Sequence, residues 1–86
     1  MTVFIDMPIW KKSKKGRKSY CHMMSDVSLD DLHQFAAENG IKRHFFHNNR
    51  MCPHYDIAEE QIPQVKSAGA IQISSKEMVM IARKMR

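Results

Sequence analysis

Short apolar runs separated by polar segments predict four strands in this chain. Residues 2–6 (TVFID) contain three consecutive β-favouring apolar residues, which is typical of a buried strand. Residues 20–24 (YCHMM) and 70–74 (AIQIS) alternate, so each would present different side chains on its two faces. Residues 43–48 (RHFFHN) are also expected to form a strand.

A capping signal opens the first predicted helix, residues 29–39. Ser28 with Asp31 resembles a capping box, with aspartate in place of the usual glutamate or glutamine. Apolar residues then recur at helical spacing, and Gly40 is a typical stop.

A second helix is predicted from Asp56, with Glu59 completing a box-like start, to about Ser67. Pro63 conflicts with the interior of that helix, where it would cost about 3 kcal/mol. Either the helix kinks there, or its regular part begins near Gln61 with Pro63 in the first turn.

The last predicted helix starts at a third capping box, made by Ser74 and Glu77. Its buried stripe is Met78, Ile81, Ala82 and Met85. The predicted order is β-β-α-β-α-β-α, which favours a small, mostly parallel sheet of about four strands with three helices packed on it.

Length and composition fit one α/β domain spanning residues 1–86. No apolar run approaches the about 18 residues of a membrane-spanning helix, so no membrane partner is expected. Asp6 interrupts the region where a secretion signal would be apolar, and Cys21 and Cys52 form no disulfide framework. A cytoplasmic location, in a bacterium or a phage-infected bacterial cell, is therefore expected. A chain this short gains stability from a partner subunit, so a homo-oligomer is one expectation.

The net charge of +5 has a local origin. A basic loop is predicted at residues 11–19, and "KKSKKGRK" within it has no acidic residue. Cations beside Trp10 and Tyr20 suit phosphate contact with base stacking, so this loop is the predicted nucleic-acid contact. The alternative is a solvated loop that only keeps the protein soluble. The basic residues are Lys11, Lys12, Lys14, Lys15, Arg17 and Lys18.

Polar residues that follow the predicted strands suggest a site, because ligands of parallel α/β sheets bind at the carboxyl ends of the strands. The catalytic candidates are Asp6, His54 and Asp56. The ligand-binding candidates are His22, Asp26, His54, Tyr55 and Asp56. The metal-ligating candidates are Asp6, His22, His47, His54 and Asp56, whose oxygen and imidazole donors suit a divalent ion that activates water.

Each candidate also has a purely structural explanation. Asp56 could act only as a helix N-cap, and His33 could be a hydrogen-bonded core histidine. Cys21 would be an inert strand cysteine rather than a nucleophile. Zinc held by Cys21-His22 and Cys52-x-His54 would lack zinc-finger spacing.

Several stretches of the chain carry a resemblance: TVFID, GRKSYCHMMSD, LDDLHQFAAENGIKRHFF, HYDI and AGAIQISSKE. Taken together they resemble the family known as domain of unknown function 4031, found in bacteria and their phages. The resemblance implies a short cytoplasmic α/β protein and no particular activity. The lysine-dense loop and Cys52-Pro53 depart from the family pattern. Its signature stretches fall on Asp6, His22, Asp26, His33, His54, Tyr55 and Asp56.

Three functions remain open from the sequence. The first is a binding module that holds a phosphate-bearing ligand, a nucleotide or a nucleic acid, at the Asp/His rim. The second is a metal-dependent phosphodiesterase or nuclease that uses the same residues, with a divalent metal ion as cofactor. The third is a phage-type inhibitor that binds a host protein or a signalling nucleotide.

Overall fold

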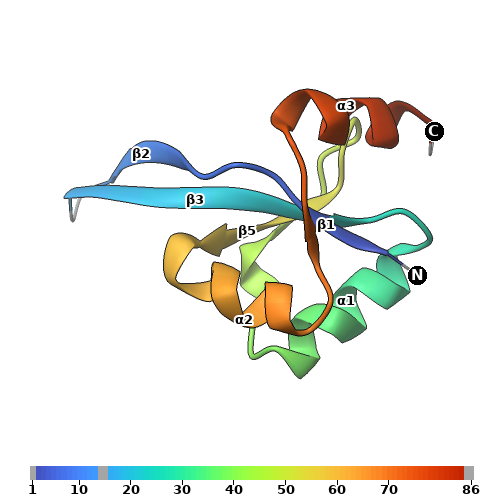
Figure 1. Cartoon of the computed structure of the whole chain (residues 1–86), viewed down its shortest axis with the longest axis horizontal. Coiled ribbons are helices and arrows are strands. Elements are labelled where there is room, and N and C mark those ends of the chain that lie inside the picture. The colour runs from blue at the N-terminus through green and yellow to red at the C-terminus, as the bar shows by residue number, and fades with distance from the viewer. Residues whose placement is uncertain (1, 14–15, 85–86) are drawn as a thin grey trace.

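A computed structural model describes residues 2–13 and 16–84 of the chain (Figure 1). Its strands are β1 (Val3–Ile5), β2 (Ile9–Ser13), β3 (Gly16–Ser25), β4 (Phe46–His47), β5 (His54–Ala58) and β6 (Ile71–Gln72). Its α-helices are α1 (Leu29–Glu38), α2 (Ile62–Ser67) and α3 (Ser75–Lys84), with short 3₁₀ turns at Arg43–Phe45 and Glu59–Gln61.

The six strands form one mixed sheet, in the order β4-β5-β3-β1-β6, with β2 also paired to β3. Among the strand pairs of the described residues, β1–β6 is parallel and the others are antiparallel. The α/β class with three helices is confirmed, whereas the mostly parallel sheet of about four strands is wrong. The error arises because β2 and β5 were not predicted, and both pair antiparallel with the long strand β3.

The helices cover both faces of the sheet (Figure 1). Helices α1 and α2 lie on one face and α3 lies on the other. The larger core lies between the sheet and the first two helices, and it includes Cys21, Met23, Leu32 and Ile57. A smaller core joins Met24 to α3. Within residues 2–13 and 16–84, no helix is long and apolar enough to cross a membrane.

Two of the predicted capping boxes start helices where expected. Ser28 Oγ accepts the N–H of Asp31 at 3.2 Å, at the start of α1. Ser74 Oγ accepts the N–H of Glu77 at 3.1 Å, while Glu77 Oε1 accepts the N–H of Ser74 at 3.2 Å. These local signals position α3 over the sheet.

The helix predicted from Asp56 is wrong at its start, because residues 54–58 form strand β5. Tyr55 and Ile57 are buried against the main core, and this burial favours a strand over a helical turn. Regular helix begins only at Ile62, with Pro63 in its first turn. The sequence left that option open, and it is the one that the structure adopts.

The predicted basic loop is largely a β-hairpin. Strands β2 and β3 run past the body of the domain, as the blue and cyan strands of Figure 1 show. Residues 11–13 lie in β2 and residues 16–19 in β3, while Lys14 and Lys15 lie outside the described residues. Pairing with β3 across the hairpin overrides the low β propensity of lysine here.

Candidate metal centre

Strand alternation brings four polar side chains to the sheet face that α3 covers. His22 of β3 pairs directly with Asp56 of β5, and His47 of β4 pairs with His54 of β5. Because side chains alternate along a strand, His54 and Asp56 share one face while Tyr55 points to the other. The cluster thus depends on three neighbouring antiparallel strands, and not on the carboxyl ends of parallel ones.

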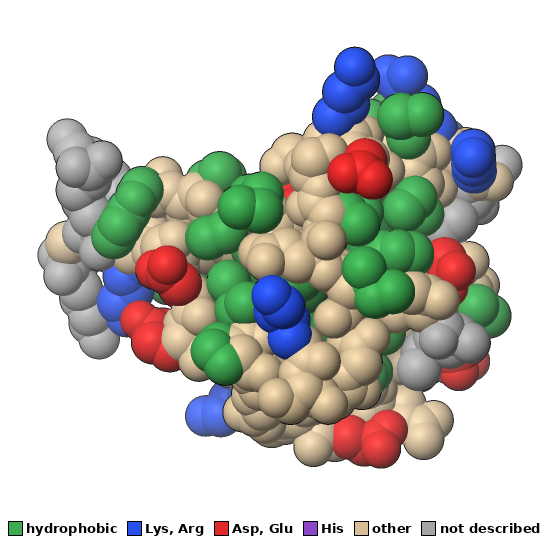
Figure 2. Space-filling model, in the orientation of Figure 1, with side chains coloured by type: hydrophobic (Ala, Val, Ile, Leu, Met, Phe, Trp, Pro, Cys, Tyr) green, Lys and Arg blue, Asp and Glu red, His purple; other side chains and the backbone are tan. Residues whose placement is uncertain are grey.

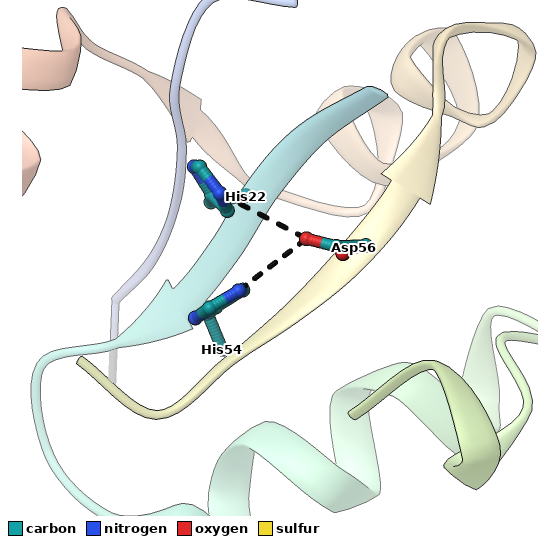
Figure 3. A group of neighbouring side chains, drawn as sticks. All are labelled: His22, His54 and Asp56. Atoms are coloured by element: carbon teal, nitrogen blue, oxygen red, sulfur yellow. Dashed lines mark ion pairs between the residues drawn. The ribbon is translucent and has the colours of Figure 1, made fainter. Parts of the chain in front are cut away.

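The Asp56 carboxylate is the centre of this cluster. Its Oδ1 lies 3.3 Å from His54 Nε2 and 3.8 Å from His22 Nε2. Figure 3 shows both imidazoles pointing at this carboxylate from adjacent strands. Its Oδ2 lies 2.9 Å from Nε2 of His47, which is the most exposed of the three histidines at 55%.

The opposite ring nitrogens of His22 and His54 already have partners. His22 Nδ1 donates to Asp6 Oδ2 at 2.7 Å, because an ionised carboxylate only accepts. His54 Nδ1 donates to the carbonyl of Cys52 at 2.6 Å. In the neutral imidazoles the proton is therefore on Nδ1, and each Nε2 directs a lone pair towards Asp56.

Asp6 is buried and lies where the edge of the sheet is interrupted. Strand β1 ends at Ile5 and β2 begins at Ile9, while β3 continues opposite both strands. In this gap Asp6 Oδ1 accepts the backbone N–H of His22 at 2.7 Å, and Ser75 Oγ of α3 lies 3.5 Å from Oδ2. Asp6 therefore fixes both the backbone and the ring of His22.

The surroundings of His54 favour its neutral imidazole, and those of Cys21 disfavour thiolate chemistry. Burial lowers the pKa of His54, against smaller opposing contributions from the Cys52 carbonyl and Asp56. Burial, together with Asp6 and Asp56, raises the pKa of the Cys21 thiol to about 12. Cys21 also lies in the core on the opposite face from His22, so the Cys/His zinc set considered from the sequence is not assembled around it.

Four of the five metal-ligating candidates from the sequence form this cluster and the fifth, Asp6, is hydrogen-bonded to His22, while two ligand-binding candidates lie outside it. Asp26 is exposed, and its Oδ1 accepts the N–H of Thr2 at 2.9 Å. Tyr55 is buried on the other face of the sheet, where its hydroxyl and His33 Nδ1 share a hydrogen bond of 2.7 Å. Asp56 is a strand residue and not the helix N-cap that was considered for it.

The lowered pKa of His33 makes part of the stability pH-dependent. Burial, then Arg43, lowers the pKa of His33 below 6.5. As the pH drops, this histidine therefore takes up its proton in the unfolded chain before it does so in the folded protein. The free energy of unfolding should then fall as the pH drops below about 6.5. Urea unfolding at about pH 7.5 and about pH 5.5 should show a smaller fall for His33→Gln than for the parent. An unchanged pH dependence in that variant would contradict the assignment.

The donor set fits a first-row divalent ion. One atom each of His22, His54 and Asp56 lies within 4.8 Å of the others. Two ligand atoms on opposite sides of an ion, each bound at about 2.1 Å, would lie about 4.2 Å apart. The distances from Asp56 Oδ1 to His22 Nε2 and to His54 Nε2 are both shorter than this value. Partners on the remote Nδ1 atoms are the outer-shell feature of metal-binding histidines. Two imidazoles and one carboxylate suit manganese, iron or zinc better than magnesium or calcium.

Together these observations define a small α/β domain with a His/Asp cluster on a mixed sheet. The chain belongs to the family described as "Protein of unknown function (DUF4031)", whose match covers residues 3–85. This confirms the family resemblance seen in the sequence. Neither a curated protein nor a solved structure matches the chain.

Proposed function

We propose that this protein is a divalent-metal-dependent phosphodiesterase that acts on a phosphate-bearing ligand. The observation that carries the proposal is the convergence of two imidazole Nε2 atoms on one carboxylate oxygen. In each imidazole the remote nitrogen is hydrogen-bonded, which is the arrangement of metal-binding histidines. Two nearby carboxylates would repel a phosphate group unless a cation lay between them.

The proposed residue roles follow from this arrangement. His22, His54 and Asp56 would hold the ion, and Asp6 would orient His22. A divalent ion in this position supplies a Lewis acid that neutralises phosphate charge and makes water a better nucleophile. In the hydrolysis, an oxygen–phosphorus bond forms from water, the phosphorus–ester oxygen bond breaks, and the departing oxygen takes a proton.

His47 is the residue best placed to move protons in this reaction. It is the exposed histidine of the cluster, and its Nε2 contacts Asp56 Oδ2 at 2.9 Å. It can therefore exchange protons with solvent while it stays beside the proposed ligands. Its role is to accept the proton that water loses and to return one to the leaving group.

The experiment is hydrolysis of bis(4-nitrophenyl) phosphate by the whole protein with manganese, zinc or magnesium. We expect turnover with manganese or zinc, and a loss of at least about a hundredfold in His54→Ala, because one of three ligands is removed. His44→Ala is the matched control, since His44 is exposed and lies outside the cluster. Bound metal without turnover would reject the phosphodiesterase and leave the binding module as the function.

A further inference from the structure

The His/Asp cluster is part of the wall of a larger pocket. The pocket has a volume of about 420 Å³, and Asp6, His22 and His54 form part of its lining. Ile9 of β2 and the α3 residues Met78 and Val79 also line it. One cavity thus combines two of the proposed metal ligands, His22 and His54, with an apolar wall.

The apolar wall has no role in the proposed metal chemistry. Ile9 is 46% exposed and Val79 49% exposed, although both could pack against a ligand. Met78 contributes a thioether, which makes favourable contacts with aromatic rings. In Figure 2, hydrophobic side chains reach the surface between the β2–β3 hairpin and α3. The wall therefore suits a flat ring that is attached to the phosphate group.

Polar groups at the pocket favour a nucleobase over other aromatic rings. Asn49 also lines the pocket, and its Oδ1 accepts the N–H of Met51 at 2.9 Å, which holds the carboxamide in place. Carboxamides recognise base edges through paired donors and acceptors. The volume lies at the low end of the about 300–1,000 Å³ typical of small-molecule pockets, so it suits one ring system and a sugar better than a lipid chain.

The hairpin beside this pocket points to an anionic ligand as well. Its register places Lys11 opposite Lys18, and Lys12 opposite Arg17. The sequence of this hairpin is rich in cations, which favour contact with phosphate groups. Ile9, at the start of β2, belongs to both the hairpin and the pocket lining.

We propose that the substrate is a nucleotide unit, with its base against Ile9, Met78 and Val79 and its phosphate at the His/Asp cluster. This inference rests on the proposed phosphodiesterase function, because it assigns the phosphate to the same metal site. It adds a specificity that the cluster alone does not provide, since a phosphate ester without a base would lack the apolar contact.

The test compares binding of adenosine 5′-monophosphate and ribose 5-phosphate to the whole protein in the presence of manganese. Calorimetry should give at least about tenfold tighter binding for the nucleotide, the change expected from burying one apolar ring. Val79→Asp should remove that advantage, so that the nucleotide binds no more tightly than ribose 5-phosphate. Met80→Asp is the matched control, because Met80 is 52% exposed on the same helix and does not line the pocket.

A second variant, Ile9→Ser, changes the apolar wall at β2 rather than at α3. It keeps the inference testable if the Val79→Asp variant does not fold. Equal affinity for the two phosphates would overturn the inference, even if manganese binding and diester hydrolysis persist. Loss of manganese binding itself would instead count against the proposed function. If a single-stranded oligonucleotide binds more tightly than adenosine 5′-monophosphate, and this difference disappears at high salt, the nucleotide unit is part of a nucleic acid. Equal affinity for the two would identify a free nucleotide.

Discussion

Manganese or zinc at a hundred times its dissociation constant should raise the melting temperature of this protein by about 10–20 °C. Binding at that ratio stabilises the folded state by about 2.7 kcal/mol. In a domain of this size, 1 kcal/mol corresponds to about 4–8 °C. The effect is expected because the ligands come from β3 and β5, which are far apart in the chain and close only when the sheet is formed. Scanning calorimetry with and without the ion measures it.

The His54→Ala variant should abolish this stabilisation. His54 is only 13% exposed and its Nδ1 is hydrogen-bonded to Cys52, so its ring is fixed before an ion arrives. His44→Ala, which changes an exposed histidine outside the cluster, should keep the full shift. An equal shift in both variants would place the bound ion elsewhere and reject the cluster as the metal centre.

The parts of the fold that could be predicted from the sequence are those with local signals. Ser28 and Ser74 cap α1 and α3 through hydrogen bonds to residues three positions ahead. Such contacts depend on only a few neighbouring residues, and the sequence displays them directly. The consecutive apolar residues of β1 are equally local.

Strands β2 and β5 could not be predicted in the same way. Residues 9–13 include two lysines, and their strand exists because β3 provides a partner across the hairpin. In β5 the sequence does alternate, with Tyr55 and Ile57 buried between less buried neighbours. That short pattern competed with a box-like pair, Asp56 and Glu59, which has the spacing of a helix start. Tertiary burial decided between the two.

The candidate site shows the same division. Asp6, His22 and His54 could be identified from the sequence as chemically capable residues, because apolar packing does not require their side chains. The expected reason for their meeting, parallel strands that end at one edge, was wrong. His22 and His54 meet because β3 and β5 are antiparallel neighbours, and Asp6 reaches His22 from the gap between β1 and β2. The apolar wall was missed because Ile9 lies in a strand that was not recognised, although the apolar Ile9-Trp10 pair after Pro8 was a visible signal.

Asp6→Asn should lower metal affinity by about 10–100-fold, with only a small change in stability. Asp6 Oδ1 accepts the backbone N–H of His22, so the oxygen of the new carboxamide would keep that position. Its NH₂ group would then face His22 Nδ1, where Oδ2 now accepts. Because NH₂ donates, His22 Nδ1 must become the acceptor and its proton must move to Nε2. An Nε2 that carries a proton cannot bind a metal ion.

The fold tolerates this change because the relocated proton has an acceptor. His22 Nε2–H would point at Asp56 Oδ1, which lies 3.8 Å away. If these two side chains moved slightly closer, Nε2–H would donate a hydrogen bond to Oδ1, in place of the present contact between two acceptors. Nitrogen-15 NMR of the imidazole rings should report the altered tautomer of His22, and calorimetry should report the loss of affinity for manganese or zinc. Asp26→Asn is the matched control, because Asp26 also accepts a backbone N–H but lies outside the cluster. Unchanged metal affinity with an altered tautomer would show that His22 is not a ligand, and the metal centre would then have to be built from His47, His54 and Asp56 instead.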